Sequence, residues 1–122
     1  MQYVLLIYET PKAFEQREAQ EGDFVAAWRA YYQATVAAGI FAGGNPLESS
    51  GTATTVRQRD DQRSIQDGPY ANTKEQLGGF MLLELPSLDA AIDWASRCPA
   101  AAYGAVEVRP YAPATHERIT SE

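Results

Sequence analysis

Four stretches of the chain have the hydrophobic pattern of β-strands. Residues 2–8 are apolar at nearly every position and rich in β-forming residues, which predicts a strand buried on both sides. Residues 80–85 have the same character and stop at a proline. Residues 52–59 and 105–109 carry polar and apolar side chains in alternation, as a half-exposed strand requires.

Two amphipathic helices are predicted between these strands. Asp23 can cap the first, and Ser87 can cap the second, which Pro99 ends. Spacings of three and four define their apolar stripes, which are Val25, Trp28, Tyr32 and Val36 in the first helix and Leu88, Ile92 and Ala95 in the second. The order strand, helix, strand, strand, helix, strand predicts an α+β fold, a ferredoxin-like βαββαβ unit with a four-stranded antiparallel sheet.

The remaining segments contain turn-forming residues. Residues 40–51 are rich in glycine, asparagine and proline, so we expect a loop there with at most a few extended residues. An Asp-Asp turn at residues 60–61 lets residues 63–66 pair back on the strand before it. Thr73 and Gln76 form a capping-box pattern, which predicts one helical turn.

The domain is expected to end before the C-terminus. One short helical turn is expected in the polar stretch around Pro11. Residues 112–122 show no periodicity. We therefore expect a single domain over residues 1–111 and a flexible C-terminal tail over residues 112–122.

The predicted sheet has an apolar face that its own helices do not cover. A sheet of this order has its first and third strands in the centre, here residues 2–8 and 80–85, and both lack a polar face. About five large apolar side chains then point away from the helices, and leaving them in water would forgo roughly 10 kcal/mol. The pattern predicts a homodimer that packs sheet against sheet, a dimeric α+β barrel.

Composition argues against several classes of partner. The 122 residues include 10 Lys+Arg and 16 Asp+Glu, a net charge of −6, which argues against nucleic-acid binding. No apolar run approaches the ~20 residues of a membrane span and no basic leader precedes the first strand, so we expect a cytoplasmic protein without a membrane anchor. The single cysteine, Cys98, the single histidine, His116, and the lack of a nucleotide-binding motif predict no metal site and no bound cofactor.

Several motifs together resemble one protein family over nearly the whole chain. They are MQYVLLIY at the start, ATTVRQRD, DGPYANTKEQLGGF and LDAAIDWASRCPAAAYGAVEVRPY. This set is similar to the DGPF family of YCII-related domain proteins, and Tyr70 stands where the DGPF motif has phenylalanine. The resemblance implies a dimeric α+β barrel, a small cytoplasmic bacterial protein, and a largely unassigned activity. It also implies association of some members with extracytoplasmic-function sigma factors.

One departure from the wider family bears on mechanism. Enzymatic suggestions for YCII-related proteins rest on a histidine near the start of the first helix and an aspartate before the proline that follows the second. The matching positions here are near Phe24 and at Cys98. Neither can take part in acid–base chemistry with the other, so the dyad mechanism does not carry over.

Six residues are candidates for a ligand site, with Asp67 and Glu107 as candidate bases. Asp67 and Tyr70 flank a stiff Gly-Pro turn that can present a carboxylate and a phenol to a cavity, although Asp67 can equally bind backbone amides of its own turn. Glu107 and Arg109 lie on one strand face ~6–7 Å apart, as base and anion clamp or as an edge ion pair.

The last two candidates are Lys74 and Tyr8. Lys74 can offer an ammonium near the Gly-Pro turn, or it is a solvated charge, and Tyr8 is either a ligand contact or a packed aromatic residue. The predicted function is small-molecule binding in a dimeric barrel, extending to cofactor-independent catalysis on a small polar substrate. The alternatives are a non-catalytic regulatory module that serves a sigma factor, and a domain that has lost its binding site.

Overall fold

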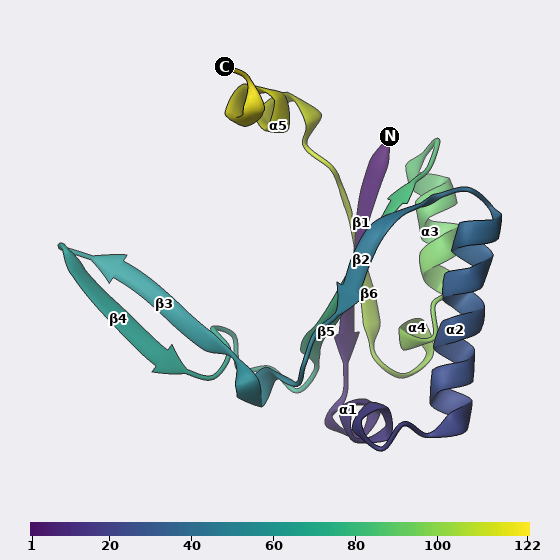
Figure 1. Cartoon of the computed structure of the whole chain (residues 1–122), viewed down its shortest axis with the longest axis horizontal. Helices are drawn as coiled ribbons and strands as arrows, with labels where there is room; N and C mark the ends of the chain where they lie inside the picture. Colours follow the sequence, from purple (N-terminus) through teal and green to yellow (C-terminus); the bar gives the residue numbers. More distant parts are fainter.

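The computed structural model describes residues 1–122 and contains a four-stranded sheet, a separate two-stranded sheet and five α-helices (Figure 1). In chain order the elements are β1 (Gln2–Glu9), α1 (Pro11–Glu18), α2 (Gly22–Ala37), β2 (Phe41–Pro46), a 3-10 turn η1 (Ser50–Thr52), β3 (Thr54–Arg59), β4 (Gln62–Asp67), β5 (Gln76–Glu84), α3 (Leu88–Arg97), α4 (Ala100–Tyr103), β6 (Ala105–Pro110) and α5 (Pro113–Thr120).

The main sheet confirms the predicted α+β class and its central strands. Its order is β2-β5-β1-β6, and each neighbouring pair is antiparallel. The two strands that lack a polar face, β1 and β5, are the two in the centre, and β6 forms one edge as predicted. Burying both faces of a strand requires apolar residues on both, which is why the least polar segments take the central positions.

The other edge strand is β2, so the prediction of residues 52–59 as the edge strand was wrong, as was the loop predicted over residues 40–51. The glycines that indicated a turn instead let two backbones approach closely. Gly44 has φ +138°, and a Cβ there would collide with the carbonyl oxygen of Phe80 on β5. A glycine inside a strand often marks such an approach, and the register of β2 shifts between Phe41 and Gly43.

Residues 63–66 pair back on the predicted edge strand, as expected, but the two strands form a sheet of their own. Strands β3 and β4 form a hairpin that projects away from the rest of the chain (Figure 1). Asp60 and Asp61 at its tip have φ of +51° and +61°, the conformation that two-residue hairpin turns favour. Val56 pairs with Ile65, and these apolar side chains are 60% and 58% exposed, so the hairpin lacks a packing partner within the chain.

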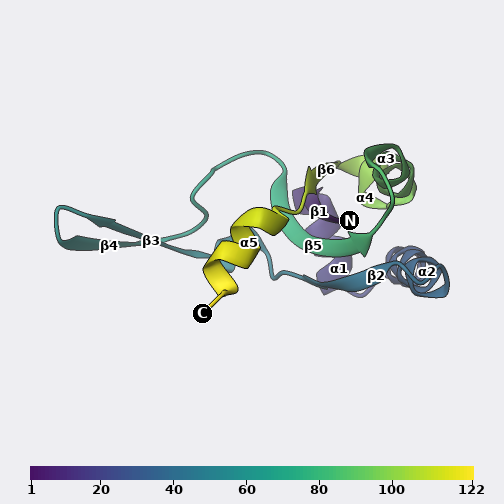
Figure 2. The same cartoon turned by 90° about the horizontal axis from the view of Figure 1, so that it is seen from above.

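Helices α2, α3 and α4 lie on one side of the main sheet, whereas the hairpin and α5 extend to the other side (Figure 2). The two long helices bury only part of the predicted stripes, and Trp28 of α2 packs against the core as predicted. In α2 the buried residues are Tyr31 and Thr35, while Tyr32 and Val36 are half-exposed. In α3 the predicted stripe residue Ala95 is buried together with Ala91, whereas Leu88 and Ile92 are half-exposed.

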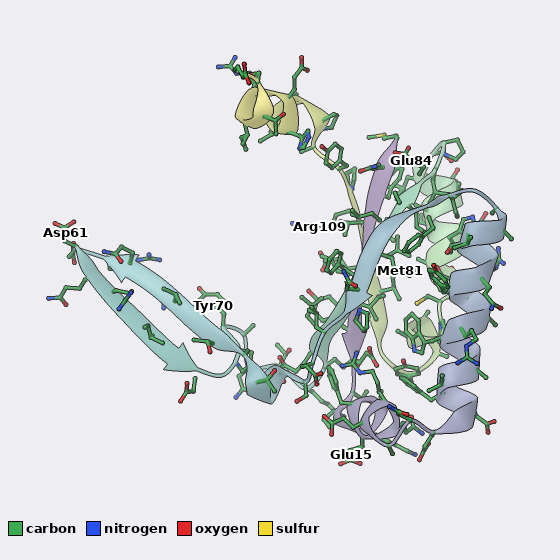
Figure 3. All side chains as sticks on the ribbon, in the orientation of Figure 1. Glu15, Asp61, Tyr70, Met81, Glu84 and Arg109 are labelled. Atoms are coloured by element: carbon green, nitrogen blue, oxygen red, sulfur yellow. The ribbon has the colours of Figure 1, made fainter.

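The core lies between the sheet and these helices. Its fully buried residues from the two central strands are Tyr3, Leu5, Ile7, Met81 and Leu83. Figure 3 shows Met81 pointing toward the helix layer and Arg109 pointing away from it. Tyr31 donates a hydrogen bond of 2.7 Å to the carbonyl of Trp94, which ties α2 to α3 above the core.

The opposite face of the sheet is apolar in its centre, as predicted. Residues of β1 alternate between buried and partly exposed, and the partly exposed set includes Val4 and Leu6. Leu6 pairs with Phe80 on one side and Glu107 on the other, and Val4 pairs with Leu82 and Arg109. Cross-strand partners share a face, so an apolar centre is bordered by a charged β6 edge. We call this surface the open face.

Other predicted segments differ in detail. The expected helical turn at residues 73–76 is absent, although Gln76 does donate to Thr73 within the loop that leads into β5. The short turn expected near Pro11 is the longer helix α1, and α5 occupies the tail in which no element was expected. None of the helices has the length and hydropathy of a membrane span.

Candidate functional site

A buried carboxylate, Glu9, stands at the end of the central strand β1. Side chains of β1 alternate, and the buried positions Tyr3, Leu5 and Ile7 are followed on the same face by Glu9, which is only 3% exposed. An acid in this position has to be paired or hydrogen-bonded, because a buried charge is otherwise costly.

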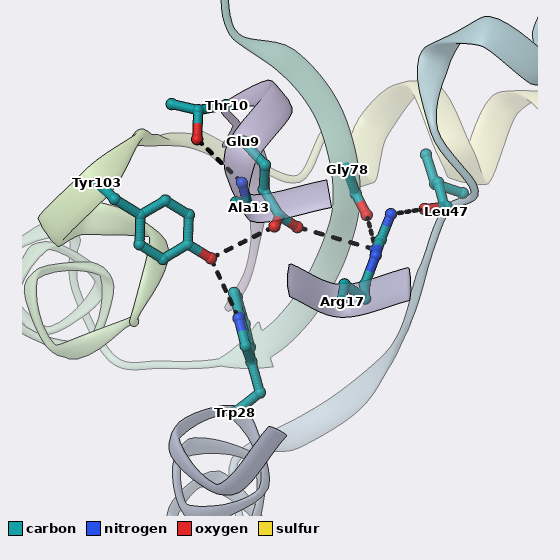
Figure 4. Close-up of polar contacts among 8 residues, drawn as sticks. All are labelled: Glu9, Thr10, Ala13, Arg17, Trp28, Leu47, Gly78 and Tyr103. Atoms are coloured by element: carbon teal, nitrogen blue, oxygen red, sulfur yellow. Dashed lines mark hydrogen bonds and ion pairs between the residues drawn. The ribbon is translucent and has the colours of Figure 1, made fainter. Parts of the chain in front are cut away.

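Three side chains from three helices surround the Glu9 carboxyl group (Figure 4). Tyr103 of α4 donates a hydrogen bond of 3.3 Å to Glu9 Oε2, and Trp28 of α2 donates one of 3.2 Å to the same phenol oxygen. Arg17 of α1 lies with Nη1 3.8 Å from Glu9 Oε1. The carboxyl group therefore accepts one hydrogen bond from the chain and has capacity for more.

Arg17 is itself held by two backbone carbonyls. Its guanidinium donates to Gly78 at 3.1 Å and also to Leu47. The close approach of β5 to the carboxyl group requires a glycine, because a Cβ at position 78 would lie 2.6 Å from Glu9 Oε1. Gly78 therefore makes room for the carboxylate.

Burial controls the protonation of this cluster. Desolvation raises the pKa of Glu9 above its ordinary value of 4.5, and the Arg17 charge and the Tyr103 hydrogen bond only partly oppose it. Burial also raises the pKa of Tyr103, so its hydroxyl keeps its proton and acts as a donor to Glu9. A carboxyl group with a raised pKa keeps its proton to higher pH than an exposed one, which suits it to act as a proton donor or acceptor toward a bound molecule.

The raised pKa of Glu9 leads to a prediction about stability. The folded state holds the Glu9 proton more tightly than the unfolded state, so protonation favours folding. That contribution is complete below the ordinary pKa and is lost as the pH rises through the raised one. Urea unfolding from about pH 4 to about pH 8 should show wild type losing stability with rising pH relative to Glu9→Gln. A constant difference between the two proteins would contradict the raised pKa, and Glu107→Gln, which removes an exposed carboxylate, is the control.

Glu9 lines a cavity of about 490 Å³ on the helix side of the sheet, which we call the helix-side cavity. The cavity is bounded by α1, α2, β1, β2 and β5, and much of its wall is aromatic. The aromatic residues from α2 and β2 are Phe24, Trp28, Tyr31, Tyr32 and Phe41. A space of this size with few polar groups is typical of small-molecule sites.

The predicted pair Glu107 and Arg109 lies elsewhere, on the open face at the β6 edge. Arg109 Nε is 3.4 Å from Glu107 Oε2, and both side chains are at least half-exposed. The two residues share a face, as their spacing predicted, and they form the edge ion pair that was the alternative to a ligand clamp. Such exposed pairs contribute about 1 kcal/mol or less.

Two other predicted residues, Tyr8 and Tyr70, line a second hollow of about 510 Å³ at the base of the hairpin. Tyr70, which Figure 3 labels, is 75% exposed. The centroid of its ring lies 5.4 Å from the Arg57 guanidinium carbon. Asp67 is exposed at the end of β4, where its side chain makes no hydrogen bond to the turn, and Lys74 is exposed in the loop. Neither Asp67 nor Lys74 lines either cavity.

The Glu9 cluster was missed from sequence although one signal for it exists. Continuing the alternation of the first strand by one residue past Tyr8 places Glu9 on the buried face. The partners Arg17, Trp28 and Tyr103 come from separate helices, and no spacing in the sequence relates them. Cys98 is buried, and burial raises the pKa of its thiol to about 11, so the thiol keeps its proton and is unreactive.

Comparisons with known proteins agree with this fold. The model of the YCII-related domain matches residues 1–115. An uncharacterised protein, R00369 of Rhizobium meliloti (strain 1021), is 38% identical over 100 residues, which cover 80% of this chain and 77% of that protein.

A solved structure is also similar to the chain. It is 5-chloro-2-hydroxyhydroquinone dehydrochlorinase (TftG) from Burkholderia phenoliruptrix AC1100, in complex with 2,5-dihydroxybenzoquinone. The TM-score is 0.56 at 21% identity, and the likeness covers 92% of this chain and 94% of that one. At this identity the likeness shows a shared fold. The family model and the relative together show that the chain belongs to the YCII-related domain family.

Proposed function

We propose that this protein binds a small planar molecule in the helix-side cavity and that Glu9 exchanges a proton with it. The observation that carries the proposal is the buried carboxyl group of Glu9 in the wall of a largely aromatic cavity. An aromatic wall favours a flat, partly apolar ligand. A carboxyl group held by Arg17 and Tyr103 is positioned to give a proton to such a ligand or to take one.

Proton exchange involves only the ligand and the carboxyl group of Glu9. Proton transfer from the ligand to Glu9 leaves an anion in the cavity, and the reverse transfer returns the proton. Tyr103 donates to one carboxyl oxygen and so fixes the orientation of the other. TftG, which shares the fold, was solved with a bound dihydroxybenzoquinone, and a hydroxylated ring of that kind is a ligand class that fits this proposal.

Direct binding tests the assignment of Glu9. Calorimetric titration with 2,5-dihydroxybenzoquinone is expected to show binding to wild type and at least about tenfold weaker binding to Glu9→Gln. The matched control is Glu107→Gln, which removes the carboxylate predicted from sequence and should bind like wild type. Weaker binding to Glu107→Gln than to Glu9→Gln would instead place the site on the open face. If wild type does not bind the compound, hydroxylated rings of this kind are not its ligands.

We also propose that two copies pack through their open faces to form the dimeric barrel expected from the sequence. Val4, Leu6, Phe80 and Leu82 leave an apolar surface that no element of the chain covers. The projecting hairpin has a second uncovered apolar pair, Val56 and Ile65. A lone two-stranded hairpin is marginally stable in water, so a partner surface would stabilise it. In such a dimer Glu107 and Arg109 contribute to the interface as an ion pair.

The regulatory alternative, association with a sigma factor, stays a prediction, as does a cytoplasmic location. The roles of Asp67, Tyr70, Tyr8 and Lys74 as site residues also stay predictions. Of these four, Tyr8 and Tyr70 lie together in the second hollow, and a ligand there would contact both.

A further inference from the structure

The charges around the helix-side cavity do not balance. Three charged side chains line it, namely Glu9, Arg17 and Arg29, so the wall has one more positive than negative charge. The chain as a whole has a net charge of −6, which makes a locally positive wall unusual for this protein. A surplus positive charge at a cavity favours an anionic ligand.

Only one of the two arginines is free to bind a ligand. Arg17 is occupied by Glu9 and by the carbonyls of Gly78 and Leu47. The side chain of Arg29 forms no ion pair and donates no hydrogen bond to any group of the chain. It is exposed, so it stands at the mouth of the cavity rather than on its floor.

Arg29 lies on the side of α2 that faces the cavity. Val25, four residues before it, and Tyr32, three residues after it, also line the cavity. Residues at these spacings lie on one face of a helix, so Arg29 belongs to the stripe that faces the ligand space. The neighbouring aromatic side chains offer a flat surface beside the guanidinium.

We propose that the natural ligand is a small aromatic acid, whose carboxylate Arg29 binds at the mouth while its ring lies among the aromatic side chains. The proposal rests on the proposed function and names the ligand class of the same site. Arginine is suited to this role because its planar fork binds both oxygens of a carboxylate. Glu9, on the inner wall, then faces the part of the ring remote from the carboxylate.

A matched pair of probes tests the charge requirement. Calorimetric titration with 4-hydroxybenzoate and with 4-hydroxybenzamide compares the same ring with and without the negative charge. Wild type is expected to bind the acid at least about tenfold more tightly than the amide. Arg29→Gln should lose most of that difference by weakening the acid alone. Arg118→Gln, the same charge change on α5 and distant from the cavity, should bind both probes like wild type.

The outcomes separate this proposal from the function on which it depends. Equal affinity of wild type for acid and amide would overturn the role of Arg29 while supporting an aromatic ligand in the cavity. An equal loss of affinity for both probes in Arg29→Gln would also overturn the role of Arg29, because a charge contact cannot explain weaker binding of the amide. Failure of wild type to bind either probe would overturn the aromatic-acid proposal, whereas the titration with 2,5-dihydroxybenzoquinone decides the proposed function separately.

Discussion

Leu6→Asp is expected to convert the protein from a dimer to a monomer. Leu6 lies in the centre of the open face, between Phe80 on β5 and Glu107 on β6. In the proposed dimer, the substitution would place an unpaired charge in an apolar interface, next to the existing carboxylate of Glu107. An uncompensated buried charge costs about 3–5 kcal/mol, which weakens the association of the two copies by a factor of about 100 to about 4,000.

Sedimentation velocity at micromolar concentration measures this directly. Wild type should sediment as a dimer and Leu6→Asp as a folded monomer. The control is Leu88→Asp, which introduces the same charge at a half-exposed apolar residue in the helix layer and should remain dimeric. A monomeric wild type, or a dimer that persists in Leu6→Asp, would show that the open faces do not pack together.

Gly44→Ala is expected to destabilise the protein more than any other substitution in β2 that adds a single methyl group. The residue has φ +138°, and its new Cβ would collide with the Phe80 carbonyl oxygen and lie 2.8 Å from the Met81 Cα. Backbone strain costs about 1–3 kcal/mol, and the clash with backbone atoms adds about 1–3 kcal/mol. The free energy of unfolding should therefore fall by about 2–6 kcal/mol.

Comparison with Gly43→Ala separates the cost of the clash from the cost of backbone strain. Gly43 has φ +145°, but a Cβ there would meet only a side-chain atom of Leu82, at 3.7 Å. We expect the free energy of unfolding of this control to fall only by the cost of the strain, about 1–3 kcal/mol. Equal losses for the two variants in urea unfolding would mean that β2 does not approach β5 as closely as described.

The central part of the fold was predictable because it depends on burial. The runs of apolar residues in β1 and β5 leave these strands no stable position except the centre of a sheet, and Pro86 and Pro99 limit the elements beside them. The open face followed from the same pattern. These predictions required only the period of the side chains and the number of helices available to cover them.

The edge of the sheet was not predictable by the same means. Glycine, asparagine and proline in β2 are typical of turns, and only the backbone around Phe80, far along the chain, explains their presence in a strand. Conversely, the regular alternation in β3 favoured a sheet strand, whereas the tight Asp60–Asp61 turn pairs it with β4 alone. Local patterns indicate strands, but partners far along the chain decide which sheet they join.

The candidate site shows the same limit. The acids chosen from sequence, Asp67 and Glu107, are polar residues where polar residues are expected, and both are exposed. Glu9 is a better candidate because it is an acid at a position where the strand requires an apolar residue. Deviations of this kind from a burial pattern concentrate at functional sites.

The location of a bound ligand tests the account most directly. A crystal structure of the protein with 4-hydroxybenzoate should show the ring between α2 and the sheet, beside Trp28 and within hydrogen-bonding reach of Glu9, with the carboxylate at Arg29. A ring bound instead between two open faces near Glu107 and Arg109, or in the hollow beside Tyr8 and Tyr70, would contradict the assignment of the helix-side cavity as the site.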